Sequence, residues 1–115
     1  MDIMLGLVAG RHDLPVTDFI FGDGDITFPI NPADLQQKVA KKFDSLGLTA
    51  GGGHHITVFV TGLTPATTAV IRIAFKGHHF LTLKHFDRDT NGWIDDVILA
   101  SGDDVSFDAG MPAWN

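Results

Sequence analysis

Short apolar runs along the chain predict the strands of a buried sheet. Residues 3–9 (IMLGLVA) and 55–60 (HITVFV) are apolar at most positions, and residues 80–87 (FLTLKHFD) form a further short run that contains apolar side chains. Each run is short and is bounded by glycine or polar residues, as strands are. Because helical patterns separate these runs, we expect the three strands to be parallel.

A fourth strand is expected over residues 93–100. It follows Asn91-Gly92, the strongest two-residue signal for a β-hairpin, so it should run antiparallel to the strand before it. The stretch 87–95 also mimics the first positions of an EF-hand calcium loop. Ile98 stands where the bidentate glutamate would be, which favours the hairpin.

Two amphipathic segments predict helices that cover this sheet. The first has Asn31 as N-cap and Pro32 at its first helical position, and Gly47 ends it. The second is expected to use Thr64 as its N-cap and to end at Gly77. Its apolar residues surround most of its circumference, so it should be deeply packed.

The segments outside these elements carry weaker patterns. Residues 14–21 favour one or two turns of helix, and residues 25–30 favour a short edge strand. Residues 102–115 are acidic and then apolar, which predicts a tail that docks on a neighbour. Residues 1–115 together predict one α/β domain: a small, Rossmann-like open sheet, mostly parallel with an antiparallel C-terminal hairpin strand, and helices on its faces.

Composition narrows the classes of protein that fit this fold. With 115 residues, the chain has room for one core, and its net charge of −6 argues against binding along duplex nucleic acid. The absence of cysteine excludes disulfides and thiolate chemistry. No apolar run is long enough to cross a bilayer, so we expect a cytoplasmic protein without membrane contact.

Candidate site residues follow from the topology. Ligands of open α/β sheets bind beyond the carboxyl ends of the parallel strands, where cationic, histidine and small residues gather in this sequence. The residues placed at that edge are Gly10, Arg11, His12, Thr61, Gly62, Leu63, Thr64, Lys84, His85 and Arg88.

The Thr61–Thr64 turn is the centre of this predicted site. It joins a strand to the amino end of a helix, where backbone N–H groups and the helix dipole favour an anion such as phosphate. Gly62 would let a ligand approach the backbone closely. The alternative is a well-capped turn that binds no ligand.

Two segments resemble proteins of CRISPR-associated antiviral defence. Residues 58–70 (VFVTGLTPATTAV) resemble the strand–turn–helix of CARF domains, Rossmann-like modules that bind cyclic oligoadenylates. Residues 7–13 (LVAGRHD) resemble the opening of a small CRISPR-accessory family linked to ring-nuclease activity. The CARF turn typically reads Thr-Gly-Gly-Thr-Lys, and this sequence departs from it at Leu63 and Pro65. The resemblance implies cyclic-oligonucleotide binding by a homodimer, with or without slow phosphodiester cleavage.

The expected function is binding of a phosphate-containing nucleotide. If the chain is an enzyme, His12 or His85 would transfer a proton and Arg11 or Lys84 would stabilise the phosphorane in a metal-independent cleavage. One alternative is a sponge or sensor that captures the ligand without turnover. Another is a structural subunit that binds a partner protein.

Two pairs of histidines raise the alternative of a metal site. His54-His55 and His78-His79 each precede a parallel strand, so they should meet at the edge opposite the candidate cleft. Four imidazoles could bind zinc or nickel. Loop histidines are more often solvated, and we therefore expect neither a metal nor another cofactor.

Overall fold

The computed structural model describes residues 2–10, 13–48 and 52–99. In these residues the elements are, in chain order, β1 (Asp2–Val8), β2 (Phe19–Phe21), α1 (Pro32–Ser45), β3 (His55–Phe59), α2 (Thr64–Lys76), β4 (Phe80–Asp87) and β5 (Gly92–Leu99). The strands form one sheet in the order β2-β1-β3-β4-β5. All neighbouring strands are parallel except β4 and β5, which are antiparallel. The predicted α/β class and the antiparallel hairpin strand are confirmed.

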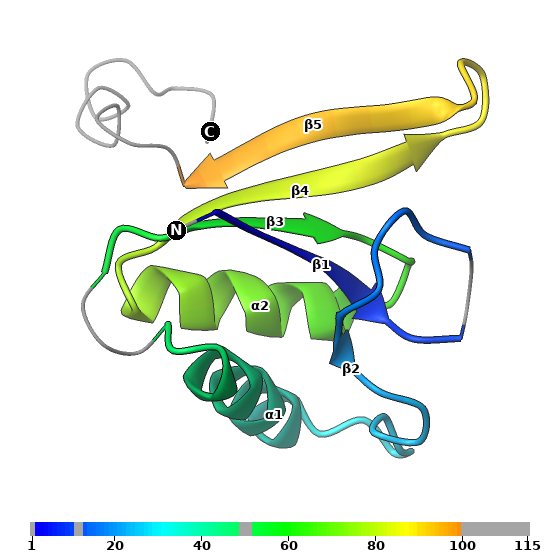
Figure 1. The fold of residues 1–115 in the computed structure, drawn as a ribbon. Coiled ribbons are helices and arrows are strands. Elements are labelled where there is room, and N and C mark those ends of the chain that lie inside the picture. The colour runs from blue at the N-terminus through cyan, green and yellow to red at the C-terminus, as the bar shows by residue number, and fades with distance from the viewer. Residues whose placement is uncertain (1, 11–12, 49–51, 100–115) are drawn as a thin grey trace, which may run out of the picture.

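Both helices lie on the same face of the sheet (Figure 1). The chain moves across the sheet in one direction in the two crossovers that contain a helix, from β2 to β3 and from β3 to β4. Parallel crossovers are almost always right-handed, so crossovers in one direction place their helices on one face. The opposite face of the sheet carries no helix among the described residues (Figure 1). We call it the open face.

The core fills the space between the sheet and the helices. Alternate strand residues such as Leu5, Val58 and Leu83 point toward the helices and are buried. Val39 and Phe43 of α1 belong to the same buried core. Burial of such side chains is the main favourable term in folding, about 1.5–3 kcal/mol each.

The two helices begin differently. The Asn31 side chain accepts hydrogen bonds from the N–H groups of Ala33 and Asp34, as the predicted N-cap requires. Leu63, rather than Thr64, is the N-cap of α2, and no side chain caps this helix. The prediction of a Thr64 cap is wrong. Thr64 is the first helical residue and Pro65 the second, so the N-cap position falls on Leu63.

Two local predictions are wrong. Residues 19–21 form strand β2 instead of helix, because Phe19 and Phe21 pair with the free edge of β1. Gly6 of β1 makes room for this pairing: a Cβ on Gly6 would lie 2.4 Å from the Phe19 ring. Residues 25–30 contain no strand. The predicted docking tail, residues 102–115, lies outside the described residues.

Candidate cleft at the carboxyl ends of the strands

A cleft of about 640 Å³ lies where the hairpin of β4 and β5 extends past the end of β3. Phe59 closes β3 opposite Lys84, whereas β4 continues to Asp87. One wall is therefore the projecting hairpin and the other is the turn after β3. Figure 1 shows that the hairpin extends beyond the end of β3. The lining residues are Asp13, Leu14, Val60, Thr61, Gly62, His85, Phe86, Arg88 and Trp93.

The turn between β3 and α2 forms one end of this cleft. Gly62 has φ +91°, a conformation that favours glycine, and the position of its missing side chain faces open space. Thr61 is buried, and its hydroxyl makes no hydrogen bond within the described part of the chain. Buried hydroxyls normally have a partner. A small residue, a hydroxyl and the amino end of α2 thus meet at one place.

His85 and Asp96 form a hydrogen-bonded pair across the hairpin. The His85 Nε2 atom lies 3.0 Å from an Asp96 carboxylate oxygen, and their side chains are 43% and 50% exposed. His85 lies opposite Ile94 and Asp96 opposite Leu83, so the two are diagonal neighbours on one face. A carboxylate in this position orients the imidazole and favours one tautomer, which suits a proton-transfer group. The sequence pointed to His85 and missed Asp96.

Aromatic side chains build the hairpin side of the cleft. The Trp93 ring packs edge-on against Phe86, with centroids 5.4 Å apart, and against Phe59 at 5.0 Å. Trp93 is half-buried and Phe86 is 49% exposed. Both rings line the cleft. An aromatic wall next to cationic Arg88 suits a ligand with a flat base and a phosphate.

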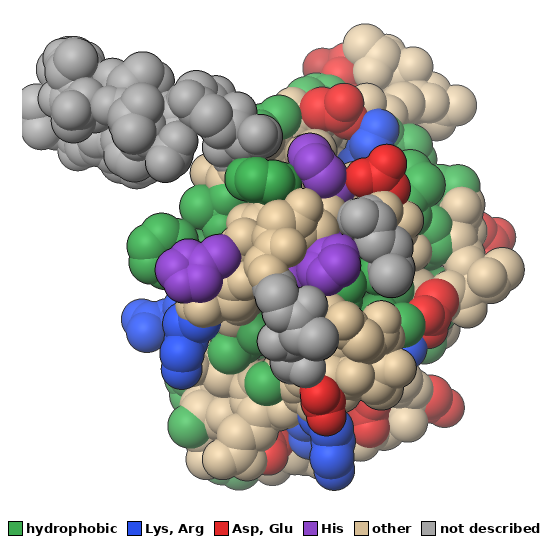
Figure 2. Space-filling view, turned by 60° about the vertical axis from the view of Figure 1, so that its left-hand side comes forward, with side chains coloured by type: hydrophobic (Ala, Val, Ile, Leu, Met, Phe, Trp, Pro, Cys, Tyr) green, Lys and Arg blue, Asp and Glu red, His purple; other side chains and the backbone are tan. Residues whose placement is uncertain are grey.

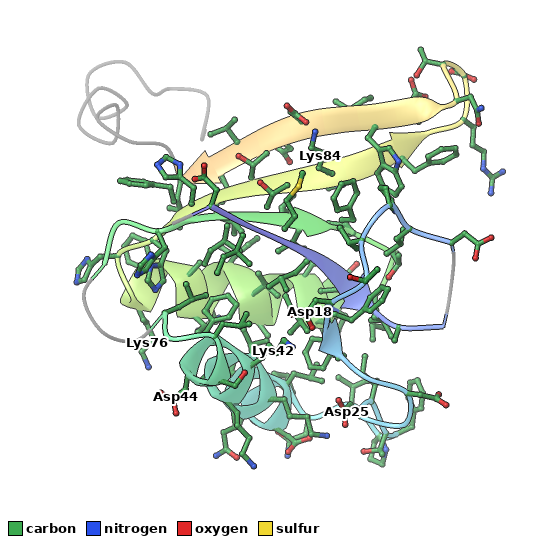
Figure 3. All side chains as sticks on the ribbon, viewed as in Figure 1. Asp18, Asp25, Lys42, Asp44, Lys76 and Lys84 are labelled. Carbon is green, nitrogen blue, oxygen red and sulfur yellow. The ribbon has the colours of Figure 1, made fainter. Side chains whose placement is uncertain are left out.

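Lys84 lies away from the cleft. It occupies the position on β4 where the side chain points to the open face (Figure 3), and it forms a 2.7 Å ion pair with Asp95 of β5. The ion pair with Asp95 holds Lys84 there, and Lys84 is not among the residues that line the cleft. The predicted grouping of these two residues in one site is therefore corrected to His85 alone.

The remaining predicted site residues divide into two groups. Gly10, Leu63 and Thr64 are described and do not line the cleft. Arg11 and His12 lie outside the described residues. Thr61, Gly62, His85 and Arg88 are brought together as predicted, and their roles in binding stay predictions.

At the other rim of the sheet, the amino-terminal rim, the two pairs of histidines come only partly together. The rings of His54 and His79 lie 5.3 Å apart, while His55 packs on Phe80. In Figure 2 the histidine side chains form separate patches. Among the described residues, no group of three or more histidine, aspartate or glutamate side chains could hold a metal ion.

His79 is the buried histidine of this rim. Its side chain is 4% exposed, and its Nδ1 atom has no hydrogen-bond partner in the described residues. Burial lowers the pKa of His79 from 6.5, and the nearby His54 lowers it further. A hydrogen bond with the backbone of Leu48 opposes this shift in pKa. His79 is therefore kept neutral as part of the packing.

Comparison with known proteins adds no relative. No protein-family model, curated protein or solved structure matches this chain. The resemblance to CARF domains therefore stands on residues 58–70 alone and that to the ring-nuclease-linked family on residues 7–13, and both stay predictions. Among the described helices, none is long and apolar enough to cross a membrane.

Proposed function

We propose that this chain binds a phosphate-containing nucleotide in the cleft between the Thr61-Gly62 turn and the hairpin of β4 and β5. The observation that carries the proposal is the meeting, in one cleft, of this turn with Arg88 and an aromatic wall. The volume of about 640 Å³ falls within the range of small-molecule sites.

Each part of the cleft matches one part of a nucleotide. The open backbone at Gly62 and the Thr61 hydroxyl suit phosphate oxygens, with the amino end of α2 behind them. Arg88 supplies a cation among the described lining residues of an acidic protein. The rings of Phe86 and Trp93 offer a surface for a base.

The ligand class that the CARF resemblance favours is a cyclic oligoadenylate. Such a ring repeats a base and a phosphate, the two chemistries found side by side in the cleft. Leu63 and Pro65 replace residues of the typical CARF turn, so the phosphate contacts here would come from the backbone and Thr61 rather than from a lysine.

If the ligand is cleaved, the geometry supports a metal-independent transfer reaction. The 2′-hydroxyl oxygen attacks the adjacent phosphorus and the bond to the 5′-oxygen breaks, giving a 2′,3′-cyclic phosphate and a 5′-hydroxyl. His85, held by Asp96, takes the 2′-hydroxyl proton, and water or a second acid returns a proton to the leaving 5′-oxygen. Arg88 stabilises the charge on the phosphorane.

Capture without turnover is the second candidate function. The half-exposed His85 and Asp96 pair equally suits a binding contact that never transfers a proton. A sponge or sensor would use the same turn, the same arginine and the same aromatic wall. Incubation with cyclic oligoadenylates, followed by chromatography of the nucleotides, distinguishes release of intact ligand from cleavage.

The binding proposal is tested with a matched pair of arginine variants. Arg88→Ala should weaken binding of a cyclic oligoadenylate about tenfold or more, because a charged hydrogen bond contributes ~1.5–3 kcal/mol. Arg72→Ala removes an exposed arginine of α2 that does not line the cleft, so affinity should hold. Calorimetry measures both. Equal losses in the two variants, or no binding by the unmodified protein to any nucleotide, would contradict the proposal.

Assembly and location complete the proposal. We place the protein in the cytoplasm, as a homodimer or larger oligomer in which a second copy contributes to the site. Light scattering at high protein concentration measures the oligomer directly. A monomer under conditions where the ligand binds would remove the second copy from the site.

A further inference from the structure

The open face of the sheet holds a row of residues that the proposed function does not use. One register row crosses four strands on it: Met4 of β1 lies beside Thr57, then Thr82, then Val97 of β5. The two ends of this row are apolar and exposed, Met4 at 54% and Val97 at 58%. We call this row the open-face band.

Parallel sheets are normally covered on both faces. The strands β1, β3 and β4 are parallel, and among the described residues both helices cover the face opposite the band (Figure 1). The four residues of the band carry no charge. The Lys84–Asp95 ion pair lies in the next row of the same face, so only the band itself is uncharged. A partly apolar row in this position is suited to an apolar chain segment rather than to a nucleotide.

The chain itself supplies such a segment beside the band. β5 ends at Leu99, two residues after Val97, and sixteen further residues follow it. After Ala100 come polar and turn-forming residues (Ser101, Gly102), and the larger apolar side chains come later. Those later side chains are Val105, Phe107, Met111 and Trp114.

The length of that segment is sufficient. Neighbouring strands lie about 4.8 Å apart, so the band from β5 to β1 spans roughly 14 Å. An extended chain covers about 3.3 Å per residue, and five or so residues would cross the band. A tethered segment also has a high effective concentration at a face next to its point of attachment, which favours it over a free partner.

We propose that residues 105–114 dock on the open-face band of their own chain. The apolar side chains of the segment cover Met4 and Val97, and the polar residues 101–104 reverse the chain direction after β5. This docking is independent of the nucleotide cleft, whose lining includes no residue of the band.

A nitroxide spin label tests this docking in the full chain. The protein has no cysteine, so Ala113→Cys gives a single attachment point for the label. The label should broaden the NMR amide signals of Met4, Thr82 and Val97 and leave those of α1 sharp. A control label at Gln37→Cys, on the exposed side of α1, should broaden α1 and leave the band sharp.

A second variant and a mixed sample decide between occupants. Val97→Glu places a carboxylate in the band beside a segment that carries Asp108 and follows Asp103 and Asp104, and it should abolish the selective broadening. Thr68→Glu, exposed on α2, should leave the broadening unchanged. Broadening that arises only between spin-labelled and isotope-labelled chains in a mixture would assign the band to a second copy and overturn the proposal. Equal broadening of the band and α1, or broadening that survives Val97→Glu, would overturn it as well.

Discussion

The two rims of the sheet each place a glycine turn next to a histidine, and the surroundings of these residues differ. At the carboxyl-terminal rim, His85 is half-exposed, lines the cleft and pairs with Asp96. At the amino-terminal rim, His79 is 4% exposed and packs edge-on against Phe43. The first histidine can meet a ligand and exchange a proton, whereas the second is part of the core.

The glycines show the same contrast. A Cβ on Gly62 would meet no atom within 4 Å, whereas a Cβ on Gly77 would lie 2.7 Å from the His79 ring. Gly62 is required by its positive φ, and Gly77 is required by close packing. The same residue types therefore form an accessible turn at one rim and a packed turn at the other.

The largest effect should come from His85. If the ligand is cleaved, His85→Gln should slow cleavage about 100-fold, because a general base typically contributes 10²–10⁴ in rate. Affinity should change little, since the phosphate and base contacts remain. Single-turnover assays with chromatography measure the rate, and calorimetry measures the affinity.

His55→Gln is the matched control for this variant. His55 is an exposed histidine of the amino-terminal rim that does not line the cleft, so neither rate nor affinity should change. If His85→Gln loses affinity without any change in products, the cleft captures its ligand and does not cleave it. Equal loss of rate in both variants would remove the functional difference between the rims.

Two glycine substitutions, one at each rim, test the same comparison, and their expected effects are smaller. Gly77→Ala should lower the free energy of unfolding by about 1–3 kcal/mol, because the new methyl group clashes with a ring that cannot retreat from the core. Gly62→Ala should cost roughly 1–2 kcal/mol through its positive φ alone. Urea denaturation measures both, and calorimetry with the nucleotide follows.

Only Gly62→Ala should weaken nucleotide binding, because only that methyl group projects beside the turn that faces the ligand. Gly24→Ala serves as its control: Gly24 has φ +84° and open space around it, and it does not line the cleft. Loss of binding in both Gly62→Ala and Gly24→Ala would mean that backbone strain, not contact with the ligand, explains the result.

The sequence predicted the helices and strands better than their arrangement in space. The parallel strands, both long helices and the hairpin were found because apolar periodicity and the Asn31 and Asn91 signals act locally. Strand β2 was missed because its three residues owe their conformation to pairing with β1. The placement of both helices on one face depends on strand order, which a single sequence does not reveal.

The site was predicted in part for the same reason. The rule for strand ends placed Thr61, Gly62, His85 and Arg88 at one edge, and these residues do line one cleft. Asp96 was missed because its position depends on the hairpin register. A two-residue Asn91-Gly92 turn would pair His85 with residue 98, whereas the observed partner is Ile94.

The longer hairpin turn explains that register. The Asp87 carboxylate accepts hydrogen bonds from the Asp89 N–H and the Thr90 hydroxyl, which adds residues to the turn. Local side-chain to backbone bonds of this kind compete with the tightest hairpin turns. Register, rather than element type, therefore decided which polar residues meet in the cleft.

The smallest effect should appear as a pH dependence of stability at the amino-terminal rim. Burial lowers the pKa of His79 below 6.5, so the unfolded chain binds a proton at this residue more readily than the folded one does. Its contribution to stability is complete above pH 6.5 and is lost progressively as the pH falls below that value toward the folded pKa. His79→Gln should remove this part of the decline, and urea denaturation between pH 8 and 5 measures it.

The residues that face His79 are His54, His78 and Phe43, so any remaining decline belongs to other groups of the chain. Equal declines in the unmodified protein and in His79→Gln would show that His79 is not held neutral by its burial, and the contrast with the cleft histidine would fail.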